Sequence, residues 1–326
     1  MSALKPFTDE QMRVLVNLRQ RYEVWRDAER ARRALPYDYR VKTVGVHRYL
    51  YEIHDRSGNG VSLGRLNDKK QRQFADYRAE KAILADRLSR SGAARDEGAR
   101  IARALRVPLL ASAAGPILRE ADIRGLLDGS LLVVGTNALL AYALEAVAGL
   151  GLADETEDFD LTWAADKPAE GAPIWDLLKT VDPTFAVNTE RTFQARNAVG
   201  YEVELLVAES RAKMVASADK PHPIALPGQE WLLLGRPVDQ VLPCRDATVA
   251  RMVAPDPRWF ALHKLWLADQ DSRSPFKRAK DRSQGFGILA AVVEAMPHYP
   301  LDAEFVASLP GELAGAWAQW QEHANA

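Results

Sequence analysis

Apolar side chains near the start of the chain recur at intervals of three and four residues. Met12, Leu15 and Leu18 begin this stripe, and Pro36 follows its last turn. Spacing of three and four places side chains on one face of a helix, and a proline ends the run. The pattern therefore predicts a helix over residues 8–35.

The pattern changes twice before the middle of the chain. Residues 38–64 contain short apolar pieces and a cluster of turn residues at 57–60, which predicts irregular or partly extended structure. Residues 66–105 are strongly charged and helical in their spacing, and we expect two helices broken near residues 91–92. Residues 107–108, a Val-Pro pair, mark a predicted boundary.

The centre of the chain combines a short apolar run, a turn and a paired acidic motif. Residues 131–134 are apolar and few enough for a buried strand, Gly135 ends that run, and residues 138–150 have a helix-like apolar pattern. Beyond an acidic loop, Asp158 and Asp160 flank one phenylalanine. Alternate residues of a strand share a face, so the two carboxylates are expected to point the same way.

The second half of the chain predicts shorter elements. Helices are expected over residues 173–180, 258–270, 276–296 and 311–322, and strands over residues 185–188, 192–197 and 201–207. Residues 209–257 are rich in proline and glycine and predict a long connection that contains short strand or helix pieces. In the strand 201–207, Glu202 and Glu204 share one face, and Val203 lies on the other.

These elements indicate an α/β (α+β) fold with a small mixed sheet and helical regions at both ends. A chain of 326 residues is long for a single domain. We divide it into a basic, mostly helical N-terminal region at residues 1–107, a core at residues 108–245 and a helical C-terminal region at residues 246–326.

Composition is that of an ordinary globular protein, with 47% hydrophobic and 27% charged residues. The single cysteine, Cys244, excludes a disulfide within the chain and fits a reducing cytosol. The first residues lack the apolar segment of a signal peptide. Residues 131–152 could imitate a membrane span, but they contain Asn137, Glu145 and three glycines. We therefore expect a cytoplasmic protein with no membrane partner.

Charge is distributed unevenly along the chain. Residues 1–107 carry 24 Lys and Arg against 14 Asp and Glu, whereas the whole chain has a formal charge of −1. A basic region joined to an acidic one is expected where the basic part holds a polyanion such as RNA. A set of arginine-rich, solvated helix faces would give the same count, and that alternative stays open.

The paired aspartates carry the strongest chemical signal. Asp158 and Asp160 would repel each other without a counter-ion, and a divalent metal is the usual reason to place two carboxylates side by side. Upstream of them, Gly135 and Thr136 stand at the start of the predicted helix. Glycine permits close backbone approach, and a hydroxyl and free amides can donate to phosphate oxygens.

The order of these parts resembles the active site of the DNA polymerase β-type nucleotidyltransferase superfamily, over roughly residues 110–290. There a strand leads into a Gly-Ser or Gly-Thr turn, and a later strand carries Asp-x-Asp. The longer gap between the motifs looks like that of bacterial members related to AbiEii-type toxins, which also carry Thr or Ser two residues before the first Asp, here Thr156. Four further segments look like that bacterial group: Tyr49-Leu50-Tyr51, Ser62-Leu63-Gly64, WFALHKLWL (259–267) and KRAKDRSQ (277–284).

The resemblance implies transfer of a nucleoside monophosphate from an NTP to an acceptor hydroxyl, with Mg²⁺ or Mn²⁺ as cofactor and pyrophosphate as product. The family's third carboxylate sits on a later strand between hydrophobic residues, which points to Glu204. Glu202 shares its face and remains an alternative. Asp158, Asp160 and Glu204 are thus the expected metal ligands and catalytic residues.

The expected nucleotide-binding residues are those that could contact the phosphates of the NTP. They are Gly135, Thr136, Asn137, Arg196, Lys264 and Lys280, with Arg191 as a further candidate. Lys264 is the leading cation. Lys277 and Asp281 lie four residues apart and predict an intrahelical ion pair. His263 is expected to be packed or on the surface rather than catalytic.

Several acceptors and two other functions stay open at this stage. The family's acceptors include RNA or tRNA ends, proteins and small molecules, and fold does not choose among them. A catalytically inactive relative could bind nucleotide or a partner without chemistry. A nucleic-acid-binding protein could use the basic N-terminal region as its main functional part. The preferred NTP, a toxin–antitoxin role and the oligomeric state are not predicted.

Overall fold

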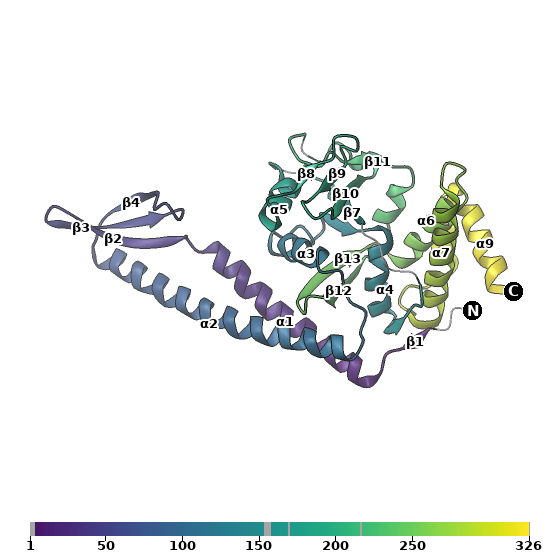
Figure 1. Ribbon diagram of the computed structural model, residues 1–326, viewed down its shortest axis with the longest axis horizontal. Coiled ribbons are helices and arrows are strands. Elements are labelled where there is room, and N and C mark those ends of the chain that lie inside the picture. Colours follow the sequence, from purple (N-terminus) through teal and green to yellow (C-terminus); the bar gives the residue numbers. More distant parts are fainter. Residues whose placement is uncertain (1–3, 153–157, 169, 216, 326) are drawn as a thin grey trace. The chain divides into compact units, whose positions relative to one another are not determined.

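A computed structural model describes residues 4–152, 158–168, 170–215 and 217–325 (Figure 1). Its secondary structure is mixed α/β, which confirms the predicted fold class. The chain forms two compact units, one of Met1–Arg19 with Ala99–Ala326 and the other of Gln20–Gly98. The predicted core and the predicted C-terminal region therefore both lie in the larger unit.

Two long helices contribute residues to both units. Helix α1 spans Asp9–Ala34, close to the prediction, and helix α2 spans Asp68–Ala104. The predicted break near residues 91–92 is wrong, because α2 is one helix of 37 residues. Ser91 Oγ donates to the Arg87 carbonyl at 2.7 Å, and Gly92 lies against the Trp25 ring. The small side chains are thus used for close helix packing rather than for a turn.

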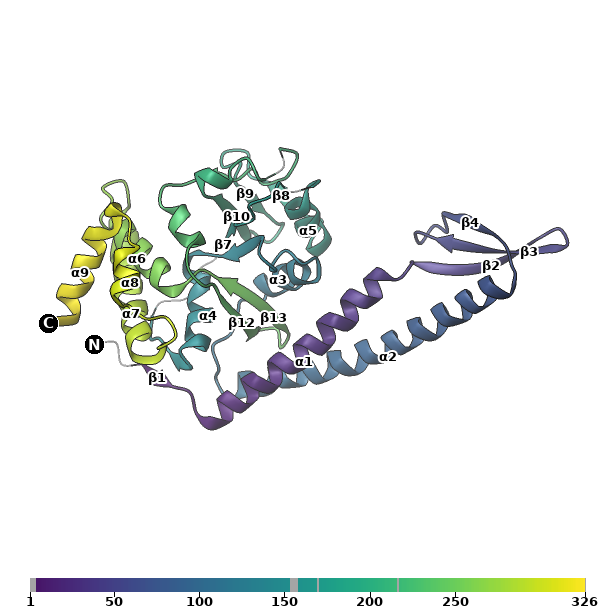
Figure 2. The same cartoon turned by 180° about the vertical axis from the view of Figure 1, so that it is seen from behind.

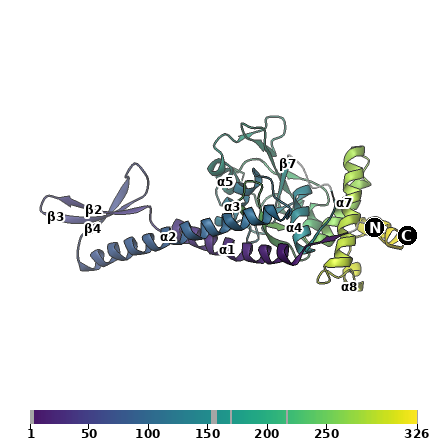
Figure 3. The ribbon, with the colours of Figure 1, turned by 60° about the horizontal axis from the view of Figure 1, so that its bottom comes forward.

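The smaller unit contains a three-stranded antiparallel sheet where irregular or partly extended chain was predicted. Strands β2 (Asp38–Val44), β3 (His47–Ile53) and β4 (Gly60–Arg65) pair in that order, beside the start of α2 (Figure 3). Leu50 and Tyr39 are buried and pack with Tyr77 of α2. Because only a few side chains of this small sheet are buried, its strands carry a weak apolar signal in the sequence.

The main sheet of the larger unit is small and mixed, as predicted. Its strand order is β5 (Leu131–Val133), β7 (Asp158–Trp163), β10 (Glu202–Val207), β9 (Gln194–Arg196) and β8 (Ala186–Val187), and β11 (Ile224–Ala225) also pairs with β10. Strands β7 and β10 are parallel, and helix α5 (Pro173–Val181) lies in the connection between them. Their apolar faces, which include Phe159 and Val203, are fully buried in the main core.

Helix α4 (Ala138–Glu145) is shorter than predicted. A left-handed residue, Val147, follows it, and the chain continues as strand β6 (Ala148–Gly149), which pairs with β1 (Lys5–Pro6). The apolar run therefore extends past the helix because it also supplies a short strand.

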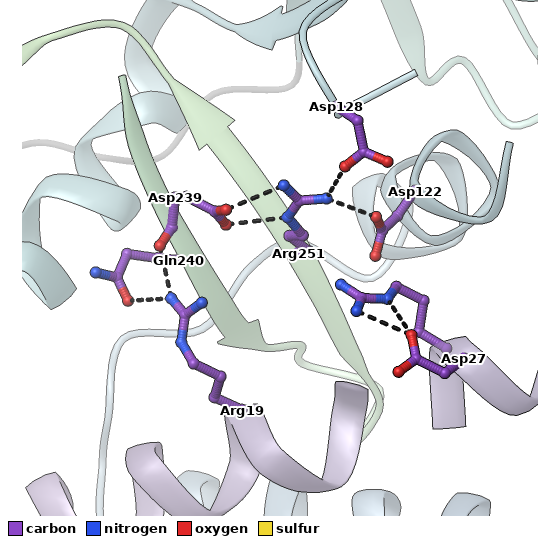
Figure 4. A network of polar contacts seen from close by, with 8 residues as sticks. Arg19, Asp27, Asp122, Asp128, Asp239, Gln240 and Arg251 are labelled. Carbon is purple, nitrogen blue, oxygen red and sulfur yellow. Dashed lines mark hydrogen bonds and ion pairs between the residues drawn. The ribbon is translucent and has the colours of Figure 1, made fainter. Parts of the chain in front are cut away.

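The second half of the predicted connection over residues 209–257 contains the expected short pieces, but it is more regular than predicted. Strands β12 (Val238–Pro243) and β13 (Val249–Ala254) form an antiparallel hairpin that packs against α3 (Ala114–Ile123) and α4 (Figure 2). Arg251 interrupts the apolar pattern of β13. Its guanidinium pairs with three carboxylates, at 2.8 Å from Asp122, 2.6 Å from Asp128 and 3.0 Å from Asp239 (Figure 4).

Helices complete the larger unit at its C-terminal end. They are α6 (Pro257–Ala268), α7 (Pro275–Ala295), α8 (Ala303–Ala307) and α9 (Ala314–Asn325), and short 3₁₀ segments lie at Gly135–Asn137, Glu209–Arg211, Gln229–Leu233 and Gly311–Leu313. Helices α6 and α7 pack closely, since a Cβ at Gly285 would come within 2.7 Å of the Leu265 side chain. Among the helices that the structure describes, none is both long and apolar enough to cross a membrane.

The start of α6 depends on one buried aspartate, and this gives a stability prediction. Asp256 accepts hydrogen bonds from the amides of Arg236 and Arg258, each at 3.0 Å, and pairs with the Arg258 guanidinium at 2.7 Å. Asp256→Ala should lower the free energy of unfolding by about 2 kcal/mol or more, because a cap and a buried ion pair are lost together. Urea unfolding measures the change.

Asp302→Ala is the matched control. Asp302 caps α8 through one hydrogen bond to the Phe305 amide at 2.9 Å, and its side chain is exposed. It should cost about 1 kcal/mol or less. Equal losses in the two variants would contradict a special role for Asp256.

Candidate functional site

The parallel pairing of β7 and β10 places four acidic residues in two facing rows. Asp160 lies opposite Glu204, and Asp158 lies opposite Glu202. All four are on the face opposite to Phe159 and Val203, because residues alternate along each strand. The sequence placed each pair on one face, but it gave no information on the register that brings the pairs together.

Burial and like charge raise the pKa values of these acids. Burial, followed by the negative charge of Glu204, raises the pKa of Asp160 to about 7, and Lys264 partly opposes this. Burial and the neighbouring Glu202 raise the pKa of Asp158, while burial and Asp158 raise that of Glu204. The folded protein therefore holds negative charges that repel one another at neutral pH.

Gly135 is required by its backbone and by the carboxylate beside it. Its φ is +66°, in the left-handed region, and a Cβ at this position would overlap with the Asp160 carboxylate. The Val134 amide donates to the Asp160 carbonyl at 3.0 Å. The turn thus lies directly against the strand that carries the aspartates, with Thr136 and Asn137 buried behind it.

A cavity of about 290 Å³ lies over the acids and brings most of the expected site residues together. Its lining includes the predicted residues Gly135, Thr136, Asp158, Asp160, Glu204, Lys264 and Lys280. Further cations line it too, namely Arg191, Arg273 and Lys277. Apolar side chains, among them Leu226, Phe260 and Leu267, form another part of the wall. One cavity therefore combines carboxylates, cations and an apolar surface.

Asn137 and Arg196 are not among the residues that line this cavity. Asn137 Nδ2 donates to the Asp158 carbonyl at 2.9 Å, which fixes the start of β7 instead. Arg196 forms an ion pair with Glu202. Their contacts in the structure are thus to the protein itself, and both lie outside the lining of the cavity.

The two candidates for the third carboxylate differ in their surroundings. Glu204 lines the cavity, whereas Glu202 does not and is paired with Arg196. Gln194 of β9 donates to both, at 2.7 Å from Glu202 and 3.1 Å from Glu204. Sequence reasoning missed Gln194. Its position in the strand before the Glu-Val-Glu strand was the only available signal.

Lys264 is buried in an ion-pair network rather than free to meet solvent. Its Nζ lies 2.8 Å from Asp281 Oδ1, and the Arg273 guanidinium lies 2.7 Å from Asp281 Oδ2. Asp281 thus joins helix α6 to the segment before α7. The predicted Lys277–Asp281 pair within one helix is wrong, because Asp281 faces α6 and Lys277 is exposed at the cavity rim.

His263 is packed, as expected, and has an unusual environment. Its ring stacks on Trp266 and meets Trp231 edge-on, and neither ring nitrogen has a hydrogen-bond partner in the described part of the chain. Burial, followed by the charge of Lys264, lowers the pKa of His263 to about 3. The imidazole is therefore neutral at physiological pH and adds no charge to the cavity.

The donor chemistry of the acids fits a hard divalent cation such as Mg²⁺, which takes carboxylate oxygens. Across the described ranges, no group of three or more His, Cys, Asp or Glu side chains is already spaced to hold a metal ion. Asp160 and Glu204 nevertheless occupy facing positions in adjacent strands, and Asp158 is two residues away on the same face. Thr156, expected near this site, lies outside the described residues.

Comparison with known proteins gives one result. Residues 112–308 match the family model described as Nucleotidyltransferase. No curated protein and no solved structure matches the chain. The match covers more than half of the chain and includes the strands, the turn and the two helices that form the cavity.

The raised pKa of Asp160 predicts a pH-dependent stability in metal-free protein. Between about pH 4 and pH 7, Asp160 is protonated in the folded protein but ionised in the unfolded chain, where its pKa is near 3.8. Its stabilising contribution is therefore complete below about pH 4 and is lost as the pH rises through about 7. Asp160→Asn should remove this loss and leave the chelator-treated variant more stable than wild type at pH 8, by about 1 kcal/mol or more.

Denaturant midpoints measured from pH 4 to pH 8 in chelator test this sign. Asp182→Asn serves as the control, because hydrogen bonds from Thr184 lower the pKa of Asp182 and it lies outside the cavity. An Asp160→Asn variant that is less stable than wild type at pH 8 would show that Asp160 is held by favourable contacts instead.

Proposed function

Because the chain belongs to the nucleotidyltransferase family, we propose that it transfers a nucleoside monophosphate from an NTP to an acceptor hydroxyl in a metal-dependent reaction. The single observation that carries this proposal is the composition of the cavity. Its lining contains carboxylates, five cations and apolar side chains. A metal–triphosphate complex needs the first two, and a nucleoside suits the third.

Asp158, Asp160 and Glu204 are the residues that would hold Mg²⁺ or Mn²⁺. When bound, such an ion would neutralise phosphate charge and favour the ionised form of the acceptor hydroxyl. Burial, followed by repulsion from a neighbouring carboxylate, raises the pKa of each of the three. Binding of a cation would relieve that repulsion, which is why this donor set favours a metal over a purely structural role.

The cations and the Gly-Thr turn would orient the triphosphate. Lys280 and Lys277 lie at the cavity wall, together with Arg191, and no carboxylate in the described residues pairs with any of them. Transfer would form a bond between the acceptor oxygen and the α-phosphorus and break the bond to the β-phosphate oxygen. Pyrophosphate would leave with that electron pair, and the proton of the acceptor hydroxyl would be released to solvent.

The acceptor belongs to one of three classes in this proposal, RNA or tRNA, a protein, or a small molecule. We favour RNA, because the residues of the smaller unit, 20–98, carry 18 Lys and Arg against 12 Asp and Glu. The relationship to AbiEii-type toxins stays a prediction. A nucleotide-binding protein without transfer activity is the alternative that the experiment below would reveal.

Transfer of label from each α-labelled NTP to cell RNA, protein extract and small metabolites, with Mg²⁺ or Mn²⁺, tests the activity. Asp158→Asn, Asp160→Asn and Glu204→Gln should each reduce transfer to background, because each removes a proposed metal ligand. Glu202→Gln is the matched control and should retain most of the activity, since Glu202 is outside the cavity wall. Nucleotide binding by wild type without label transfer to any acceptor would support the inactive alternative.

Lys280 offers a cleaner test of triphosphate binding than Lys264. Replacement of Lys264 would also break its buried pair with Asp281 and would destabilise the fold. Lys280→Ala should weaken NTP binding by roughly 1.5 to 3 kcal/mol, the value of a hydrogen bond to a charged group, and leave the melting temperature unchanged.

Calorimetric titration with Mg²⁺ and a non-hydrolysable NTP measures this change. Arg282→Ala is the control on the same helix, because Arg282 pairs with Asp269 and does not line the cavity. Similar NTP affinity in the Lys280→Ala variant and in wild type would remove Lys280 from the proposed site.

A further inference from the structure

The two faces of the small sheet in residues 20–98 differ in chemistry. Directly opposite residues in an antiparallel pair project to the same side. Val41 lies opposite Leu50, and this side is turned toward α2, where Leu50 packs with Tyr77. The residues directly before and after Val41 and Leu50 in their strands project to the other side of the sheet and form a second face.

That second face combines aromatic and basic side chains. Lys42 lies opposite Tyr49, Arg40 lies opposite Tyr51, and Tyr49 lies opposite Arg65 of β4. Both tyrosines belong to the middle strand and are half-buried, whereas the three cations at the flanking strands are exposed. We define these five residues as the tyrosine face.

The tyrosine face carries a net positive charge, because only one of its three cations is paired with a carboxylate among the described residues. Arg40 is engaged by Asp38, at 3.1 Å. In the part of the chain that the structure describes, Lys42 and Arg65 have no carboxylate partner. Lys42 Nζ lies 4.8 Å from the centre of the Tyr51 ring, so a cation is already placed against an aromatic surface.

We propose that the tyrosine face binds single-stranded RNA. Aromatic rings on a sheet stack with unpaired bases, and cations beside them contact the phosphates between those bases. A duplex keeps its bases stacked on one another, so this face suits a single strand. The two rings would hold two neighbouring bases. This inference rests on the proposed function, because it supplies the surface that would hold an RNA acceptor.

Fluorescence anisotropy with a labelled 12-nucleotide oligouridylate, in the full chain and without NTP, tests the proposal. Tyr49→Ala and Tyr51→Ala should each weaken binding by roughly 5- to 100-fold, the range for loss of one base–aromatic stack. Tyr49→Phe and Tyr51→Phe keep the rings and should bind within about twofold of wild type. These two variants separate stacking from a fold defect, which melting curves of every variant also check.

The charge contribution is tested separately. The Lys42→Ala/Arg65→Ala double variant should reduce the slope of log affinity against log salt by about 1.4, because each phosphate contact on a single strand contributes about 0.7. Arg48→Ala is the matched control, since Arg48 lies on β3 beside Thr43 on the opposite face. It should change the slope little.

Three results would overturn the proposal. The first is unchanged affinity in the Tyr49→Ala/Tyr51→Ala double variant. The second is binding of a 12-base-pair RNA duplex as tight as that of oligouridylate, which would indicate phosphate contacts alone. The third is tighter binding of the matching oligothymidylate, which would assign the surface to DNA.

Failure of this inference is distinguishable from failure of the proposed function. The Asp160→Asn variant should bind oligouridylate as wild type does, since Asp160 is not part of the tyrosine face. Wild type that binds oligouridylate but transfers no label would contradict the proposed function alone. Label transfer by wild type, together with unchanged affinity for oligouridylate in the Tyr49→Ala/Tyr51→Ala double variant, would contradict the inference alone.

Discussion

The candidate site depends on the register of two parallel strands. When β10 pairs with β7 so that Glu204 faces Asp160, four carboxylates are brought together on one side of the sheet. The apolar face of the same strands is buried in the main core, so the register cannot slip by one residue without exposing that core. Hydrophobic burial thus holds like charges together, at an electrostatic cost that the raised pKa of Asp160 records.

Some side chains around the acids reduce the electrostatic repulsion between them. Gln194 donates to Glu204, and Arg196 neutralises Glu202. Lys264 opposes the rise in the pKa of Asp160, while its own Nζ is held by Asp281. Asp158, Asp160 and Glu204 keep raised pKa values even so. A protein that needed these acids only for structure would gain stability by losing one of them.

The sequence predicted the strand–turn–helix order, the paired aspartates and the strand of Glu204, because alternating apolar residues and a glycine that ends an apolar run are clear local signals. It did not predict the hairpin of β12 and β13, since Arg251 breaks the apolar pattern and finds its three acidic partners only in the folded chain. Likewise, helical spacing predicted that Asp281 pairs with Lys277. In the structure α6 packs on α7, and Asp281 pairs with Lys264 instead. Long-range contacts decide these cases, and local spacing does not encode them.

The most direct test of the central claim is the position of a bound metal. Crystals grown with Mn²⁺ and a non-hydrolysable NTP would be measured for anomalous scattering from manganese. The account predicts a manganese peak coordinated by oxygens of Asp158, Asp160 and Glu204, with the triphosphate beside it along the wall that holds Lys280. A peak bound through Glu202 instead of Glu204, or nucleotide bound in the cavity with no manganese at the acids, would contradict it.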